Sequence, residues 1–285
     1  MAKTIGLVVK NGARALEKAG ELETWLKSKG CGVVRKSADP PQHAPPKGSS
    51  AGALQNLFCV VVLGGDGTFL NAVRWMGDQQ VPILGVKFGA VGFLAEAAEE
   101  SLFTVVENIL YKPFATRSRM RLRVEVWRGD QRLASEAIFN DVVINKGALA
   151  RLAHIKTYVN EGYLTDYRAD GLIVATPTGS TAYSLAAGGP IMHPTVQGIL
   201  VTPICPFTLT NRPLIVPDTA RIKIQLAEKS ADIFLTFDGQ VGLPIDENHT
   251  IVVQKDPVAV QMIQLPDRDF FDVLKTKLRW SGSRL

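Results

Sequence analysis

The sequence predicts an α/β protein in two parts: an N-terminal Rossmann-like parallel α/β domain and a C-terminal β-rich domain, built as layered sheets or a sandwich. Up to about residue 113, short apolar runs alternate with segments whose apolar residues recur at helical spacing, as in parallel sheets covered by helices. From Arg119 on, apolar and polar residues alternate one by one, as in antiparallel strands with one buried face. A last amphipathic segment predicts a C-terminal helix that packs back on the first domain.

The N-terminal domain is expected to begin with a strand, a helix and a second strand. Leu16, Leu22 and Leu26 share one face of the helix, and Gly30 closes it. Residues 37–52, rich in Pro, Gly and Ser, are expected to form a mobile loop. The expected strands cover 5–9, 32–35, 58–63 and 82–86, and the expected helices cover 13–29, the segment after Gly67, and 99–110.

Antiparallel pairing is predicted for the second part. Leu122, Val124 and Val126 share one strand face, and Arg-Gly-Asp at 128–130 predicts a hairpin turn. A short helical stretch is expected at 181–187. Further runs expected to continue the antiparallel pattern lie at 220–226, 232–237, 250–254 and 258–265.

The last helix is expected at 269–280, with Phe270, Phe271, Leu274 and Leu278 on its apolar face. The predicted domains are therefore an α/β domain over 1–117, a β-rich domain over 118–266 and a returning helix over 267–285.

Composition narrows the class of protein. The chain has 285 residues, of which 46% are hydrophobic and 21% charged, as in ordinary globular proteins. The net charge of +5 is spread along the chain without a basic tract, so no nucleic-acid partner is expected. Three widely separated cysteines predict buried thiols in a reducing compartment. No signal-peptide pattern or apolar stretch of roughly 18 to 20 residues is present, so a cytoplasmic protein without a membrane partner is expected.

The densest chemical signal is the turn Gly64-Gly-Asp-Gly67, between a buried apolar run and a helical segment. Three glycines in four residues allow positive φ and a close approach of the backbone to a ligand. Backbone N–H groups of the turn and of the helix N-terminus can then face phosphate oxygens. The predicted phosphate-binding loop comprises Gly64, Gly65, Gly67 and Thr68. The alternative is a glycine-rich turn in which Asp66 merely caps the helix.

Two further stretches favour nucleoside binding. Asn140 and Asp141 precede an apolar strand; an amide can pair with an adenine edge, and a carboxylate accepts from ribose hydroxyls. The alternative is a strand-entry turn. The hydroxyls, glycine and exposed amides of Thr176–Tyr183 open a helix and suit a phosphate or a sugar, with a plain capping loop as the alternative.

Two stretches carry weaker signals. Residues 167–171 place the cation of Arg168 and the carboxylate of Asp170 on one side of an extended segment, with a surface ion pair as the alternative. Residues 237–240 are typical of a hairpin turn, in which Gln240 either faces a ligand or only completes the turn.

Motifs of several common enzyme classes are absent from the sequence. It contains no Gly-x-Gly-x-x-Gly after a strand, no Gly-x-x-x-x-Gly-Lys-Ser/Thr, no Gly-x-Ser-x-Gly and no His-Glu-x-x-His, and its four histidines lie far apart. The sequence therefore does not favour membership of these classes: ordinary Rossmann oxidoreductases, P-loop NTPases, α/β-hydrolases and zincins.

Taken together and in order, these stretches resemble the NAD kinase family over roughly Val60–Trp280. Gly-Gly-Asp-Gly-Thr alone also occurs in lipid kinases and phosphofructokinases, whereas the whole set is specific. The matching segments are 63–70, 82–86 with 92–94, 140–144, 170–184, 203–206, 211–213 and 238–240.

The resemblance implies that the protein phosphorylates the 2′-hydroxyl of the adenosine ribose of NAD to give NADP, with ATP as phosphate donor and a divalent cation, normally Mg²⁺. It also implies that NAD binds between the two domains and that the chain assembles as a homodimer or homotetramer. Two competing hypotheses are a kinase acting on a lipid or sugar phosphate and a non-catalytic module that senses NAD or NADP.

The resemblance also implies roles for individual residues. Asp66 is implied as the general base, and no residue is implied as a dedicated protein ligand of the metal. The implied NAD-binding residues are Asp66, Gly67, Phe93, Asn140, Asp141, Arg151, Arg168, Asp170, Thr178, Thr181, Ala182, Tyr183, Ser184, Leu185, Ala186 and Gln240.

Overall fold

The computed structural model describes residues 3–38, 56–88, 92–95, 97–147, 152–228, 232–266 and 269–280. These residues form two compact units. Unit 1 contains the described residues up to Ser118 and those from Val260 on, and unit 2 contains those from Arg119 to Ala259. Most of the predicted 37–52 loop, from residue 39 on, lies outside the described residues.

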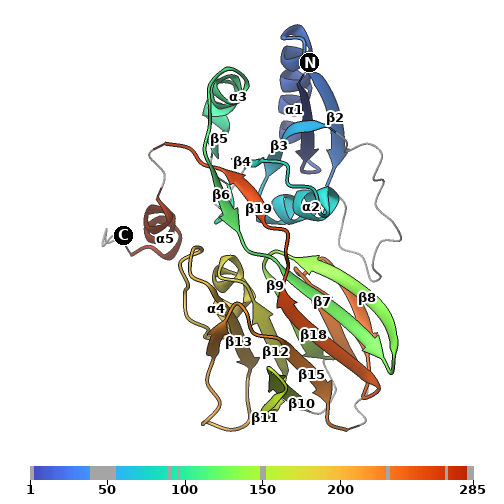
Figure 1. Cartoon of the computed structure of the whole chain (residues 1–285). Coiled ribbons are helices and arrows are strands. Elements are labelled where there is room, and N and C mark those ends of the chain that lie inside the picture. Colours follow the sequence, from blue (N-terminus) through green and yellow to red (C-terminus); the bar gives the residue numbers. More distant parts are fainter. Residues whose placement is uncertain are drawn as a thin grey trace. The chain divides into compact units, whose positions relative to one another are not determined.

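Unit 1 is built on a largely parallel sheet with the strand order β2-β1-β3-β4-β19-β6, and β5 also pairs with β4 (Figure 1). Its strands are β1 (Thr4–Val9), β2 (Gly32–Ser37), β3 (Leu57–Gly64), β4 (Ile83–Lys87), β5 (Ala97–Ala98), β6 (Thr116–Arg119) and β19 (Val260–Ile263). Its helices are α1 (Ala13–Ser28), α2 (Asp66–Met76), the 3₁₀ turn η2 (Glu99–Ser101), α3 (Leu102–Tyr111) and α5 (Phe270–Leu278).

Helices cover both faces of this sheet. Leu7 of β1 belongs to one buried cluster with Leu22 of α1 and Val106 of α3. The next residue back along β1, Gly6, faces the other way, where a Cβ would lie 3.2 Å from the ring of Trp75 on α2. Because successive residues of a strand point to opposite faces, α1 and α3 cover one face and α2 covers the other. The predicted parallel α/β domain is confirmed.

Unit 2 contains two six-stranded antiparallel sheets, with the strand orders β11-β10-β15-β18-β7-β8 and β14-β13-β12-β9-β16-β17. The first comprises β7 (Leu122–Arg128), β8 (Gln131–Ile138), β10 (Ala153–Val159), β11 (Gly162–Ala169), β15 (Ile222–Leu226) and β18 (His249–Lys255). The second comprises β9 (Asp141–Lys146), β12 (Gly171–Ala175), β13 (Gly198–Ile204), β14 (Leu214–Pro217), β16 (Ile233–Phe237) and β17 (Val241–Ile245).

The two sheets of unit 2 share one core, as in a sandwich. Val124 of β7 and Ile251 of β18 belong to the same buried cluster as Ile144 of β9 and Leu235 of β16. The opposite face of the second sheet is buried as well, in a smaller cluster that contains Ile173. The predicted β-rich domain is thus confirmed, including the hairpin turn at 128–130 between β7 and β8.

Three details differ from the sequence prediction. The run 258–265 was expected to continue the antiparallel pattern, but its strand β19 pairs in parallel with β4 of unit 1. A buried apolar strand carries no local mark of its partner, so periodicity alone misassigned it. On α5, Leu274 is buried while Phe271 is 53% exposed, so the predicted apolar face is only partly covered. All three cysteines are free, but only Cys59 is buried, which raises its thiol pKa to about 12.

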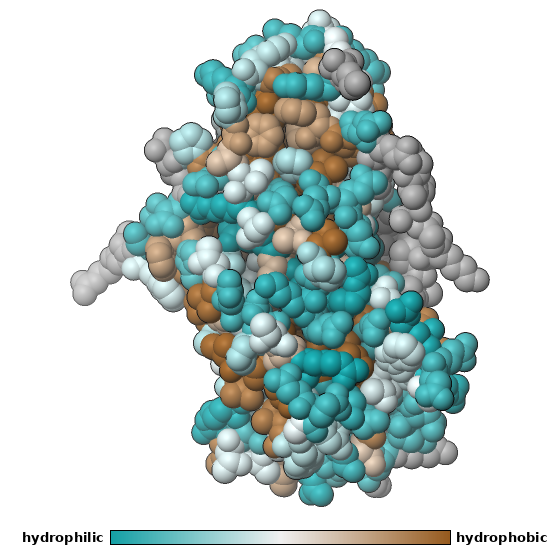
Figure 2. Space-filling model, viewed as in Figure 1, coloured by the Kyte–Doolittle hydropathy of each residue, from teal (hydrophilic) through white to brown (hydrophobic). Residues whose placement is uncertain are grey.

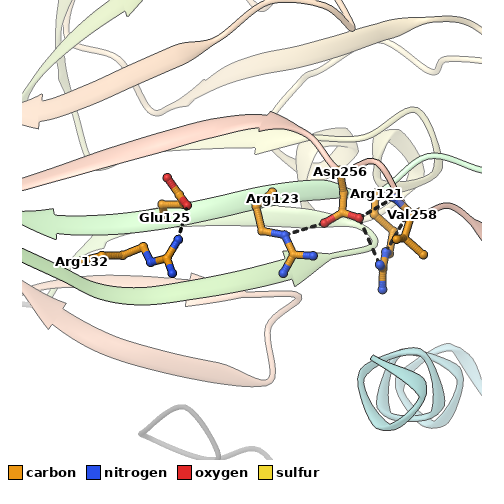
Figure 3. A network of polar contacts seen from close by, with 6 residues as sticks. All are labelled: Arg121, Arg123, Glu125, Arg132, Asp256 and Val258. Carbon is orange, nitrogen blue, oxygen red and sulfur yellow. Dashed lines mark hydrogen bonds and ion pairs between the residues drawn. The ribbon is translucent and has the colours of Figure 1, made fainter. Parts of the chain in front are cut away.

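A buried ion pair joins the two segments at which the chain enters and leaves unit 2. Arg121 and Asp256 are almost fully buried, and their Nη2 and Oδ1 atoms are 3.1 Å apart (Figure 3). Arg121 Nε also donates to the carbonyl of Val258 at 2.8 Å, and Arg123 Nε lies 2.6 Å from the other oxygen of Asp256. Two guanidinium groups therefore compensate one buried carboxylate.

We expect Asp256→Asn to lower the free energy of unfolding by about 3–5 kcal/mol, because it leaves the buried charge of Arg121 without its counter-ion. The matched control is Glu125→Gln on the same sheet, whose partner Arg132 is exposed (Figure 3); its expected cost is below about 1 kcal/mol. Urea unfolding followed by circular dichroism measures both. Equal midpoints for the two variants would contradict the prediction.

Candidate active site

The turn between β3 and α2 carries the first group of candidate residues. Gly64 ends β3, Gly65 is the N-cap of α2, and Asp66 begins the helix, so the predicted strand–turn–helix is confirmed. The expected positive φ is not: among the described residues with positive φ, Gly64, Gly65 and Gly67 do not occur. The glycines provide room instead. A Cβ on Gly64 would lie 2.4 Å from Thr68 Oγ1, whereas one on Gly65 or Gly67 would have nothing within 4 Å.

The carboxylate of Asp66 is held by a second loop. Oδ2 accepts the N–H of Phe93 at 3.0 Å, and Oδ1 accepts the N–H of Leu94 at 3.1 Å. The loop approaches so closely that a Cβ on Gly92 would lie 2.0 Å from Oδ1. The orientation of Asp66 is therefore set by a loop about thirty residues further along the chain, which its role as a helix cap would not require.

We expect Gly92→Ala to lower turnover by about 10- to 100-fold, because the added methyl displaces the Asp66 carboxylate and small misplacements of reacting groups are costly. The thermal midpoint should change little, since the displaced group is the end of a side chain. Gly20→Ala, on α1 with open space around its Cβ, is the matched control and should keep wild-type activity. Steady-state kinetics measures the turnover of both variants. Wild-type turnover in Gly92→Ala would refute the idea that Gly92 makes room for the Asp66 carboxylate.

In unit 2, one side chain binds the backbone N–H groups of three successive residues where β9 begins, Phe139, Asn140 and Asp141. The carboxylate of Asp238, in the turn between β16 and β17, accepts the N–H groups of Phe139 at 2.9 Å, Asn140 at 2.7 Å and Asp141 at 3.1 Å. From the other side, Thr176 Oγ1 donates to the carbonyl of Phe139 at 2.6 Å. Three loops are thus tied together at the ends of β9, β12 and β16.

These loops surround a pocket of about 330 Å³, a volume within the range of small-molecule sites. Two acidic residues, Asp141 and Asp238, line it together with Asn140, Asn145 and Tyr183. The complete lining is Asn140, Asp141, Val143, Asn145, Ala182, Tyr183, Thr236, Asp238 and Gly239.

Burial, the largest cause, and the nearby charge of Asp238 together raise the pKa of Asp141 to about 7, although the backbone N–H of Tyr183 acts in the opposite direction. A carboxyl group whose pKa is higher in the folded than in the unfolded state stabilises the fold below its unfolded pKa. That stabilisation is lost as the pH rises through the folded pKa. The ionised form of Asp141, which can accept from a hydroxyl, is therefore destabilised by its surroundings in the ligand-free pocket.

We expect Asp141→Asn to gain stability relative to wild type as the pH rises from 4 to 9, by on the order of 2–4 kcal/mol. The variant keeps an oxygen acceptor but has no charge to bury. Thermal midpoints of both proteins at pH 4, 7 and 9 test this. A difference between the two proteins that stays constant over that range would contradict the assigned pKa.

The remaining predicted residues are spread over unit 2. Ala182 and Tyr183 line the pocket, while Ser184 is fully buried with its Oγ 2.9 Å from Thr202 Oγ1. Asp170 pairs with Lys146 at 3.4 Å, so the Arg168–Asp170 ion pair considered from sequence is not the one formed. Arg151 lies outside the described residues. Thr178 and Thr181 lie on the 3₁₀ turn η3 (Thr178–Thr181), Leu185 and Ala186 on α4 (Tyr183–Ala186), Arg168 on β11, and Gln240 directly after the β16–β17 turn.

Sequence reasoning did not assign Asp238 or Gly92 a structural task. In the sequence, Asp238 is typical of a hairpin turn, because Asp-Gly is a common hairpin sequence. Its carboxylate is engaged by residues about a hundred positions earlier, which no local pattern reveals. The need for glycine at position 92 is visible only in the structure, where a Cβ would overlap the carboxylate of Asp66.

The fold and the two groups of residues define an α/β protein that has an oriented carboxylate at a glycine turn in unit 1 and a polar pocket in unit 2. Comparison with known proteins agrees. Residues 51–114 match the family model of the ATP-NAD kinase N-terminal domain, and residues 139–265 match that of the C-terminal domain. The chain belongs to the NAD kinase family.

Similar proteins extend this comparison over nearly the whole chain. The NAD kinase of Desulfatibacillum aliphaticivorans is 55% identical over 99% of this chain and 100% of its own length, and that of Geobacter metallireducens is 43% identical over 92% and 93%. The crystal structure of yeast NADH kinase complexed with NADH has a TM-score of 0.88 at 26% identity, covering 100% of this chain and 90% of that one. An Archaeoglobus fulgidus NAD kinase in complex with ATP shares the fold, with a TM-score of 0.75 at 23% identity over 98% and 100%.

Proposed function

We propose that this protein transfers the γ-phosphoryl group of ATP to the 2′-hydroxyl of the adenosine ribose of NAD, giving NADP. The observation that carries the proposal is the Asp66 carboxylate, fixed by two N–H groups at a glycine turn that opens a helix. Family membership supports the reaction class, since the similar curated proteins are named NAD kinase. The related structures contain NADH in the yeast enzyme and ATP in the archaeal one.

In this proposal Asp66 is the general base. A ribose hydroxyl is a poor nucleophile, and a positioned carboxylate that takes its proton contributes typically about 10²- to 10⁴-fold. The N–H groups of Phe93 and Leu94 occupy one lone pair on each oxygen and leave others for the hydroxyl. Gly65 and Gly67 leave space beside the start of α2, where N–H donors can neutralise charge on the transferred phosphoryl group.

The pocket of unit 2 is proposed to hold the adenosine part of NAD. The amide of Asn140 suits an adenine edge, and the carboxylate of Asp141 suits the ribose hydroxyls. The ring of Tyr183 supplies an apolar wall. The other residues proposed to contact NAD are Gly67, Phe93, Arg151, Arg168, Asp170, Thr178, Thr181, Ala182, Ser184, Leu185, Ala186 and Gln240.

A divalent cation, normally Mg²⁺, is proposed to enter with the triphosphate of ATP. Within the described ranges, no group of three or more His, Cys, Asp or Glu side chains is arranged to hold a metal ion. Mg²⁺ fits such a protein, because it commonly binds substrate phosphates together with only one or two carboxylates and keeps several waters. No side chain of this protein is proposed as a dedicated ligand of the cation. When bound, the cation neutralises charge on the phosphate oxygens.

We also propose a homodimer or homotetramer in the cytoplasm. Hydrophobic side chains (brown in Figure 2) lie at the surface among the hydrophilic ones. In unit 2, Phe207, Leu209 and Ile215 are 70%, 86% and 48% exposed, on or just before the edge strand β14. Exposed apolar groups on an edge strand favour association between copies. No helix in the described part of the chain is long and apolar enough to span a membrane.

We expect purified protein with NAD, ATP and MgCl₂ to form NADP, and the folded Asp66→Asn variant to form it about 10²- to 10⁴-fold more slowly. An NADP-specific dehydrogenase measures the product. Asp130→Asn, in the exposed β7–β8 turn, is the matched control and should behave as wild type. Addition of EDTA should stop the reaction.

Other outcomes separate the alternatives. Activity of Asp66→Asn within threefold of wild type removes Asp66 from the mechanism. Wild-type protein that binds NAD in a melting-shift assay without forming NADP supports the sensor hypothesis. Absence of both binding and product points to a different acceptor, such as a lipid or sugar phosphate.

A further inference from the structure

The turn between β16 and β17 contains an aspartate whose charge the turn itself does not need. Asp238 and Gly239 both have positive φ, 50° and 62°, and Gln240 donates its N–H to the carbonyl of Phe237 at 3.0 Å. This is a two-residue hairpin turn of the type that Asp-Gly and Asn-Gly both favour. Asparagine would serve the backbone equally well, so the carboxylate has another task.

That task is visible in its contacts. Three successive N–H groups, of Phe139, Asn140 and Asp141, converge on the Asp238 carboxylate at 2.7–3.1 Å. The N–H of Asp238 in turn donates to the carbonyl of Asp141 at 2.9 Å. Successive backbone N–H groups that point to one centre form an anion-binding concavity, and hydrogen bonds to an ionised acceptor are stronger than neutral ones. The arrangement therefore suits a carboxylate at position 238 and fixes the Asn140–Asp141 backbone at the pocket.

The carboxylate of Asp141, the second acidic residue of the pocket, has fewer N–H donors than that of Asp238. Around Asp141, the pocket presents the charge of Asp238 from the β16–β17 turn, and Tyr183 of α4 presents its backbone N–H and its phenol. Its own strand and β16 contribute neutral side chains, Asn145 and Thr236, and its register partner on β12 is Ala175. The two acids thus share a pocket in which one has three N–H donors and the other is buried beside it.

We propose that Asp238 is a positioning residue for NAD: it holds the Asn140–Asp141 segment in its binding geometry and places a second carboxylate beside that of Asp141. This inference rests on the proposed function, which places the adenosine of NAD in this pocket. Asp238 itself acts through its neighbours and takes no part in the chemistry at Asp66.

The main test is Asp238→Asn, which keeps the turn geometry and removes the charge. We expect KM for NAD at pH 7 to rise about tenfold or more, because the charged N–H clamp is weakened, while kcat at saturating NAD stays within about threefold. We also expect the pH midpoint of KM for NAD to move to lower pH by about one unit or more, because the like charge next to Asp141 is gone. Asp238→Gly, which also tolerates positive φ, should raise KM further.

The matched control is Asp232→Asn, directly before the other end of β16, where the aspartate also has a positive φ of 63°. It should leave both KM and its pH midpoint unchanged. A purely structural role for Asp238 predicts a lower thermal midpoint with the wild-type pH midpoint retained. That result, or wild-type KM in Asp238→Asn, overturns the proposal.

A ligand-free measurement separates this proposal from the proposed function. In a double-mutant cycle, the gain in high-pH stability from Asp141→Asn should be smaller in the Asp238→Asn background than in wild type. Equal gains overturn the charge coupling, whether or not the protein makes NADP. Wild-type protein that makes no NADP overturns the proposed function, while the cycle still decides whether Asp238 acts on Asp141.

Discussion

Both groups of candidate residues depend on one kind of interaction, a carboxylate that accepts successive backbone N–H groups from a distant loop. Among the described residues, each unit contains an example. Asp66 holds the loop at Phe93 and Leu94, and Asp238 holds the segment 139–141. Loops at strand ends have few apolar contacts of their own, so without such bonds their conformations would interconvert at low cost. Each carboxylate thereby gives a loop one geometry, and in unit 1 the same bonds also orient the proposed base.

The candidate residues also need chain segments that approach each other closely, and glycine allows this because it has no side chain. A Cβ on Gly92 would lie 2.0 Å from Asp66 Oδ1, and one on Gly179 would lie 2.1 Å from the carbonyl oxygen of Asn140. Neither glycine is among the described residues with positive φ. Both positions therefore need the missing side chain rather than an unusual backbone conformation. In this protein, the glycines of the site act by removing volume.

The buried aspartate of the core and that of the pocket have different electrostatic surroundings. Asp256 is buried between Arg121 and Arg123, so its charge is compensated and serves the fold. In the pocket, Asp141 has no such cation among the residues that line it, and its pKa rises to about 7. The same type of side chain is thus paired with two cations in one place and has a raised pKa in the other. Environment alone makes the difference.

The two-part α/β and β-sandwich fold can be predicted from the sequence alone, because periodicities of 3.6 and 2 record which faces of each element are buried. The sequence also predicts the glycine turn with Asp66, the Asn140–Asp141 pair and the family, since these signals lie within short, ordered motifs. Only the tertiary structure decided that β19 pairs with β4, that Gly92 makes room for Asp66 and that Asp238 clamps residues 139–141. These contacts join residues from about 26 to 180 positions apart, and a local pattern carries no record of a partner so distant.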